Sequence, residues 1–169
     1  MILAIDVQYD ANSALVAGVS FGSWTQSTAD QEYLTSVVEV EGYQAGKFYK
    51  RELPCILSLL DEHRLSPDII VVDGYVYLDG KSSSGLGKYL YDSLNGKVTV
   101  IGVAKKTFDN ISDEYQVFRG TSKKPLYVTA EGMSTEDAKD NVRQMSGENR
   151  IPLLLKRADQ LCRGLVEKL

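Results

Sequence analysis

The sequence has one histidine, His63, and only two cysteines, Cys55 and Cys162. A Ser-His-Asp or Cys-His mechanism would have to use His63, which lies at the end of a helix-like segment without matching partners nearby. We therefore interpret His63 as a solvated helix end, and a metal site built from several histidines is excluded. Two cysteines are too few for a disulfide framework, and their apolar surroundings predict buried thiols.

Long apolar runs are also missing. No segment approaches the roughly 20 apolar residues of a membrane-spanning helix, and no signal-peptide pattern opens the chain. We therefore expect a cytoplasmic protein without a membrane partner. The 169 residues suit one domain, 1–169, that can build its core without disulfides. The oligomeric state is not determined by the sequence, although a monomer is favoured.

The formal net charge is −4, which counts mildly against nucleic acid as a partner because proteins that bind it usually carry a basic face. The charge is unevenly spread, however, and bound cations would reverse it locally at acidic metal ligands. The basic residues that crowd the middle of the chain are Lys47, Lys50, Arg51, Lys81, Lys88, Lys105, Lys106, Arg119, Lys123 and Lys124. Nucleic acid therefore remains a candidate partner.

The apolar pattern alternates between strand-like and helix-like segments. The predicted strands are 1–7, 14–21, 32–40, 69–72, 98–103, 117–120 and 126–129, and the predicted helices are 48–64, 86–94, 134–145 and 151–169. An opening antiparallel meander is followed by parallel strands with crossover helices. This order predicts an α/β fold with a mixed β-sheet flanked by helices.

Three acidic residues stand where they favour a common pocket. Asp6 lies at the end of the first strand, Asp73 ends a fully apolar strand, and Glu52 lies near the start of the helix between them. In open α/β sheets, ligands collect beyond the carboxyl ends of the strands. Carboxylate oxygens there match the preference of Mg²⁺ or Mn²⁺. The positions therefore predict a divalent metal site.

Each acid also has a simpler interpretation. Asp73-Gly74 is a common turn pair, and Glu52 beside Arg51 would suit a surface ion pair worth less than ~1 kcal/mol. Asp6 would place a charge in or beside a core strand, where an unpaired charge costs several kcal/mol, and a metal would compensate for it. Taken singly, none of the three positions decides between a structural role and a metal.

Six blocks of sequence, taken in order, carry a more specific signal. They are Ile5-Asp6-Val7-Gln8-Tyr9, Tyr43-Gln44-Ala45-Gly46 with Arg51-Glu52-Leu53-Pro54, Val72-Asp73-Gly74, Ile101-Gly102-Val103-Ala104-Lys105, Tyr127-Val128-Thr129-Ala130-Glu131-Gly132, and Arg150-Ile151-Pro152 with Lys156-Arg157-Ala158-Asp159. In this order and spacing the chain resembles the endonuclease V family nearly end to end. Any single block is weak, whereas collinear blocks are specific.

The resemblance implies a ribonuclease-H-like fold and a Mg²⁺-dependent nuclease. The family cuts a phosphodiester one nucleotide 3′ of a deaminated base, chiefly inosine, which would give this chain a role in nucleic-acid repair, on DNA or RNA. By position, the resemblance implies that Asp6, Glu52 and Asp73 are metal ligands. It implies that Asp159 is a fourth acid of the pocket and that Lys105 contacts the phosphate. It also implies that Tyr43 is the aromatic wedge that fills the gap left by a displaced base.

Structural alternatives remain for the last three residues. Lys105 would also suit a solvated strand end, Tyr43 would suit packing under its own loop, and Asp159 would suit an ion pair with Lys156. The sequence also departs from the family, which has a histidine where Asp79 stands and a proline where Ala45 stands. Changes around a metal site typically cost about 10- to 100-fold in activity or metal affinity.

These departures leave metal-dependent phosphodiester cleavage better supported than recognition of inosine. Two alternatives stay open. One is a ribonuclease-H-like nuclease with a different substrate, and the other is a non-catalytic nucleic-acid-binding module that kept the outline of the site. A fold alone does not choose among them, because function depends on the site.

Overall fold

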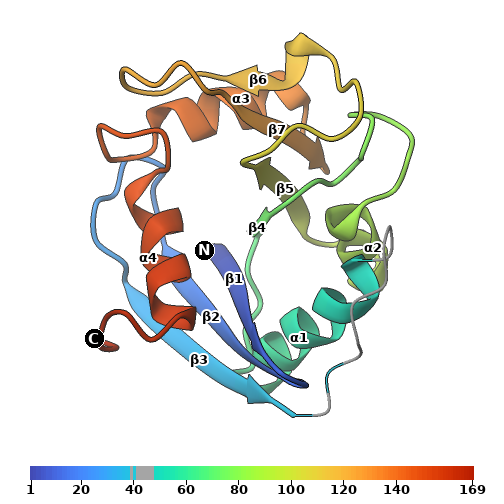
Figure 1. The fold of residues 1–169 in the computed structure, drawn as a ribbon. Helices are drawn as coiled ribbons and strands as arrows, with labels where there is room; N and C mark the ends of the chain where they lie inside the picture. The colour runs from blue at the N-terminus through green and yellow to red at the C-terminus, as the bar shows by residue number, and fades with distance from the viewer. Residues whose placement is uncertain (39, 41–47) are drawn as a thin grey trace.

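A mixed sheet forms the centre of the computed structural model, which describes residues 1–38, 40 and 48–169. Its seven strands run in the order β3-β2-β1-β4-β5-β7-β6 (Figure 1). Strands β1, β4 and β5 are mutually parallel, and the others pair antiparallel. The strands are β1 (Ile2–Asp10), β2 (Ser13–Phe21), β3 (Gln31–Val37), β4 (Ile69–Asp73), β5 (Thr99–Ala104), β6 (Gln116–Val117) and β7 (Leu126–Glu131). The predicted mixed sheet is confirmed.

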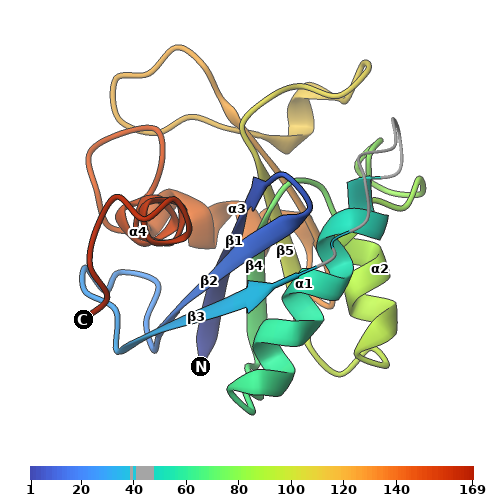
Figure 2. The ribbon, with the colours of Figure 1, turned by 60° about the horizontal axis from the view of Figure 1, so that its bottom comes forward.

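Helices cover both faces of the sheet (Figures 1 and 2). They are α1 (Phe48–Glu62), α2 (Leu86–Ser93), α3 (Thr135–Gln144) and α4 (Leu153–Cys162), and a single 3₁₀ turn covers Asp113–Tyr115. Successive side chains of a strand point to opposite faces, so Leu3 and Ile5 of β1 pack in the apolar layer with α1 and α2. Ile2 and Ala4 pack in the second layer, with α3 and α4. None of the described helices is long and apolar enough to cross a bilayer.

The prediction for the last helix was wrong at its end. Helix α4 stops at Cys162, whereas the apolar pattern predicted that it would reach Leu169. Gly164 has a φ of +70°, its N–H donates to Leu161 O at 3.1 Å, and Leu165 N–H donates to Gln160 O at 2.9 Å. These paired bonds are the Schellman arrangement that ends helices at a left-handed glycine.

Three strand ends were wrong by three residues. Strand β1 continues to Asp10 rather than ending at residue 7, so Asp6 lies inside the strand and not at its end. Strand β3 ends at Val37 rather than at residue 40, and β6 covers only Gln116–Val117 rather than 117–120. The chain leaves the sheet after Val117 because the buried Arg119 side chain turns to a loop after α3. Its guanidinium donates to Asn149 O at 2.8 Å and to Gly147 O at 3.1 Å, which satisfies a charge that would otherwise be costly to bury.

The two cysteines are buried, and the histidine side chain contacts strand β3. Both cysteines are free and buried, as predicted. His63 is not a solvated helix end, because its Nε2 lies 2.9 Å from Leu34 O and its ring centroid lies 5.2 Å from that of Tyr33. It joins the end of α1 to β3 and has no part in the acidic site described below.

Candidate active site

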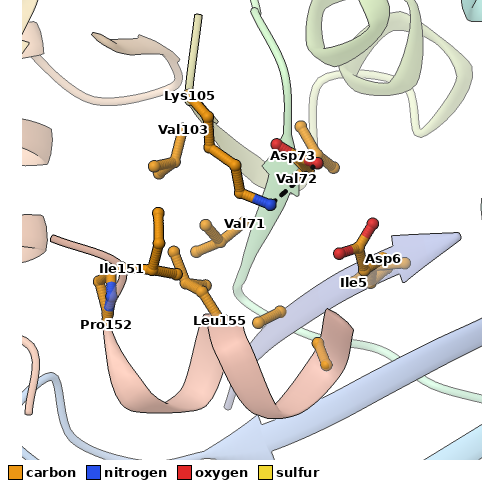
Figure 3. A pocket seen from close by; sticks show the side chains of 12 residues that line it. Ile5, Asp6, Val71, Val72, Asp73, Val103, Lys105, Ile151, Pro152 and Leu155 are labelled. Atoms are coloured by element: carbon orange, nitrogen blue, oxygen red, sulfur yellow. Dashed lines mark hydrogen bonds and ion pairs between the residues drawn. The ribbon is translucent and has the colours of Figure 1, made fainter. Parts of the chain in front are cut away.

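Three of the predicted site residues project from one face of the sheet at the end of its parallel strands. Asp6 and Asp73 follow the same alternation as Ala4 and Val71, which pack in the layer with α4. Lys105 comes directly after β5 and stands two residues beyond Val103, which also belongs to that layer. Figure 3 shows the three side chains directed into one pocket, with Ile151, Pro152 and Leu155 forming its other wall.

The carboxyl group of Asp6 is buried in a region with little compensation for its charge. The residue is 9% exposed, and it accepts a hydrogen bond from Val7 N–H at 2.8 Å. Burial and the negative charge of Asp73 raise the pKa of Asp6 to about 7, against the smaller opposing effects of that hydrogen bond and of Lys105. A cation at this position would replace the missing solvation.

Glu52 reaches the same region from the opposite layer. It belongs to α1, whose Cys55, Ile56 and Leu59 pack on the other face of the sheet. The side chain is buried, and its Oε2 has no hydrogen-bond partner among the described residues. Burial, followed by the charges of Asp6 and Asp73, raises the pKa of Glu52 well above its ordinary value. A buried, unpartnered carboxylate oxygen facing other acids fits a divalent cation.

Lys105 supplies a positive charge at the rim of the pocket. Its Nζ lies 3.5 Å from Asp73 Oδ2, and both side chains remain more than one third exposed. Such an exposed pair is weak, so the ammonium group can turn to an anionic ligand. The backbone of Lys105 is held in place, since the guanidinium of Arg150 donates to Lys105 O and, at 2.8 Å, to Pro125 O.

Asp159 faces Asp6 from α4. Among the described residues, Asp6, Asp159 and Cys162 form a group whose potential ligand atoms all lie within 4.8 Å of one another. This set differs from the predicted trio of Asp6, Glu52 and Asp73, which is more widely spread. Asp159 also accepts a hydrogen bond at 2.8 Å from Arg163 Nε, so its ion-pair partner is Arg163 and not Lys156.

Among the described residues, Glu52 does not form the surface ion pair that would be its simpler role, and Asp79, at the position of the family's histidine, lies in a loop. Glu52 makes no ion pair with Arg51 in the described part of the chain, because the Arg51 guanidinium lies over the ring of Tyr9, 3.6 Å from its centroid. Asp79 accepts hydrogen bonds from the backbone N–H groups of residues 81–83 at 2.8 to 3.0 Å. The hydroxyl of Ser82 also donates to Asp79, and this bond, followed by the backbone bonds, holds the pKa of Asp79 below its ordinary value. Asp79 therefore stabilises an exposed loop.

Some site residues were missed or lie outside the described chain. Tyr43 and Ala45 fall in the segment 41–47, which is not described, so the wedge prediction stays a prediction. Arg150 was recognised only as part of a block, and Cys162 only as a buried thiol. The i, i+3 spacing of Asp159 and Cys162 on one helix was the available signal for their common direction.

Gly102 of β5 keeps the strand end of Asp73 close to its neighbour. A Cβ at Gly102 would lie 2.5 Å from Gly74 O and 2.8 Å from Val76 N. We expect Gly102→Ala to lower the free energy of unfolding by about 1 to 3 kcal/mol, as overpacking does in cores, measured by urea denaturation. Gly22→Ala is the matched control, because its Cβ would meet nothing closer than 3.9 Å. Equal stabilities of the two variants would contradict this packing.

The arrangement can be compared with solved structures. The chain is similar to endonuclease V of Ciona intestinalis, solved with a 24mer DNA containing an inosine followed by a ribo-adenosine, with a TM-score of 0.81, 19% identity and coverage of 97% of this chain and 84% of that one. For human endonuclease V the TM-score is 0.75 and the identity 22%, with coverage of 97% of this chain and 83% of that one. For endonuclease V of Streptomyces avermitilis the TM-score is 0.76 and the identity 26%, with coverage of 97% of this chain and 80% of that one.

These likenesses define the fold class as ribonuclease-H-like α/β. A family model described as Endonuclease V matches residues 1–121, and the chain therefore belongs to the endonuclease V family of nucleic-acid-cleaving hydrolases. No curated protein matches the sequence. Asp159 and Cys162 lie beyond the matched residues, so the family model does not bear on their place in the site.

Proposed function

We propose that this single domain, 1–169, is a Mg²⁺- or Mn²⁺-dependent endonuclease that hydrolyses a phosphodiester near a deaminated base, inosine, in DNA or RNA, in nucleic-acid repair. The observation that carries the proposal is the convergence of Asp6 and Glu52, both buried and both with raised pKa. Proteins avoid burying such a pair without a partner, and oxygen donors favour hard divalent cations over soft ones.

In this proposal each residue has one task. Asp6, Glu52 and Asp73 hold the cation, and Asp159 completes the acidic wall opposite them. When bound, the cation supplies Lewis-acid stabilisation of the phosphate charge and lowers the pKa of a bound water. Lys105 orients the phosphate through its exposed ammonium group. A positive charge at this position stabilises the negative charge that develops on the phosphate during cleavage. Tyr43 would occupy the space left by the displaced base.

The apolar wall of the pocket favours this chemistry. Ile151, Pro152 and Leu155 face Asp6 and Lys105 across the pocket, and they limit the water that can reach the carboxylates. Charge interactions are stronger where water is excluded. The inner part of the site therefore combines buried acids with an apolar wall, whereas Lys105 and Asp73 stay accessible to a large anionic ligand.

A panel of oligonucleotides tests the proposal. We expect the protein with Mg²⁺ or Mn²⁺ to nick inosine-containing strands, one nucleotide 3′ of the inosine, at least about tenfold faster than matched strands with guanosine or adenosine. Single- and double-stranded DNA and RNA are compared by denaturing electrophoresis, with and without a chelator. Equal nicking of all strands would favour a nuclease with a different substrate, because the exposed Asp79 loop replaces the family's histidine.

The same panel addresses a non-catalytic binding module. That module would bind the strands without cutting them, and its affinity would fall with salt concentration as Lys and Arg contacts to phosphate are lost. Absence of nicking under all metals, with binding retained, would overturn the enzymatic proposal.

A further inference from the structure

A thiol lies beside the acids of the proposed metal site. Cys162, the last residue of α4, offers Sγ within 4.8 Å of a carboxylate oxygen of Asp6 and of one of Asp159. The side chain is buried, and Sγ donates to the backbone oxygen of Asp159, at 3.2 Å. Three potential ligand atoms of two chemical kinds therefore surround one point, supplied by β1 and by one face of α4.

A second observation, from another element, favours a cation in this region. Glu52 is 3% exposed and its Oε2 has no hydrogen-bond donor among the described residues. After burial, the charge of Asp6 is the next largest cause that raises the pKa of Glu52, so the two carboxyl groups lie in one region. Since Glu52 comes from the opposite layer, it is independent of the grouping on α4, and it adds a second buried carboxyl group to the region of Asp6.

The proposed function gives Cys162 no task. Mg²⁺ and Mn²⁺ select oxygen ligands, whereas thiolate selects softer ions such as Zn²⁺ and Cd²⁺. The position of Cys162 Sγ beside Asp6 and Asp159 would add a thiolate ligand for a soft cation, because a coordinating thiol is deprotonated by the ion itself.

We propose that Cys162, Asp6 and Asp159 form a mixed thiolate–carboxylate site that binds Zn²⁺ or Cd²⁺ in preference to Mg²⁺, and that these ions inhibit cleavage by taking Asp6 away from the catalytic cation. On binding, a metal–sulfur bond forms, and the thiol proton passes to the solvent. Cys162 also lines an open groove beside Gln8, Asp10 and Arg163, which gives the ion a path from solvent. Only the inhibition rests on the proposed function, whereas the binding does not.

Cadmium titration of the full chain tests the site without any cleavage assay. In a buffer with excess Mg²⁺, we expect Cd²⁺ to produce the ultraviolet charge-transfer absorption of a cadmium–thiolate bond, saturating at one ion per chain. The absorption should be lost in Cys162→Ser and in Cys162→Ala. It should persist in Cys55→Ser, the matched control, because Cys55 is also buried but lies in the apolar layer with α1. Asp159→Asn should weaken Cd²⁺ binding by about tenfold or more.

The outcomes separate this inference from the proposed function. Absorption in the wild type that survives in Cys162→Ala, or that disappears in Cys55→Ser, overturns the site, as does a wild type with no absorption. Should both Cys162 variants fail to fold by circular dichroism, an unchanged cadmium affinity in Asp159→Asn overturns it instead. A protein that binds Cd²⁺ through Cys162 but cuts no oligonucleotide keeps the site and loses the proposed function. A protein that cuts with Mg²⁺ but shows no cadmium–thiolate absorption keeps the proposed function and loses the Cys162 site.

Discussion

Asp6→Asn is expected to reduce the rate of inosine-dependent cleavage by at least about a hundredfold at saturating Mg²⁺. Asparagine keeps the size of the side chain and an acceptor for Val7 N–H, but it removes the charge that would hold the cation. A metal contributes several kcal/mol of transition-state stabilisation, and each ~1.4 kcal/mol corresponds to a tenfold change in rate. Single-turnover cleavage of an inosine-containing oligonucleotide measures the loss.

Asp10→Asn is the matched control for this experiment. Asp10 belongs to the same strand, β1, but is exposed and lies beyond the buried part of the strand. Its variant should cleave within about twofold of the wild type, as expected for a surface change without a special role. Wild-type rates in Asp6→Asn, or an equal loss in Asp10→Asn, would contradict the assignment of Asp6.

The same Asp6→Asn substitution is expected to stabilise the protein when metal is removed with a chelator. The ordinary pKa of an aspartate is 3.8, and burial with the charge of Asp73 raises that of Asp6 to about 7. Between these values the unfolded chain has lost the proton that the folded protein keeps, so the stability of the wild type falls as the pH rises. Above pH 7 the penalty is fully present.

The size of this gain follows from the pKa shift. One pKa unit corresponds to ~1.4 kcal/mol, so the free energy of unfolding of Asp6→Asn in chelator should exceed that of the wild type by about 2 to 4 kcal/mol at pH 8. The difference should disappear below pH 4. Urea denaturation across this pH range measures it, with Asp10→Asn as the control. A variant no more stable than the wild type at pH 8 would show that Asp6 is already compensated without metal.

Part of this site could be predicted from the sequence, because an apolar run that ends in a charged residue indicates the end of a buried strand. The apolar run before Asp73 predicted that this residue ends its strand, and Asp73 is the last residue of β4. Asp6 was predicted at a strand end but lies inside β1, directly after the last residue of β1 that pairs with β4. Lys105 followed from the same rule and from the resemblance. The boundaries of the last helix could also have been read, because Gly164 is a common stop signal that the apolar pattern of 151–169 obscured.

The rest depended on contacts between layers that no local pattern encodes. The burial of Glu52 and its unpartnered oxygen arise from the packing of α1 against the sheet. The hydrogen bonds of Arg150 to the carbonyl groups of residues 105 and 125 join segments far apart in the chain. The approach of Cys162 to Asp6 likewise depends on how α4 docks on β1. Sequence spacing gave the direction of these side chains on their helices but not their partners.

Glu52 and Asp159 lie on helices that cover opposite faces of the sheet, which makes the proposed metal binding depend on the folding of both layers. Glu52 belongs to the layer of α1, and Asp159 belongs to the layer of α4 on the other side of the sheet. In the proposed site, the cation therefore lies beside the central strands β1 and β4, between carboxylates supplied by both layers. Undocking of either helix would remove one of these carboxylates, so full occupation of the site requires both halves of the core to be folded at once.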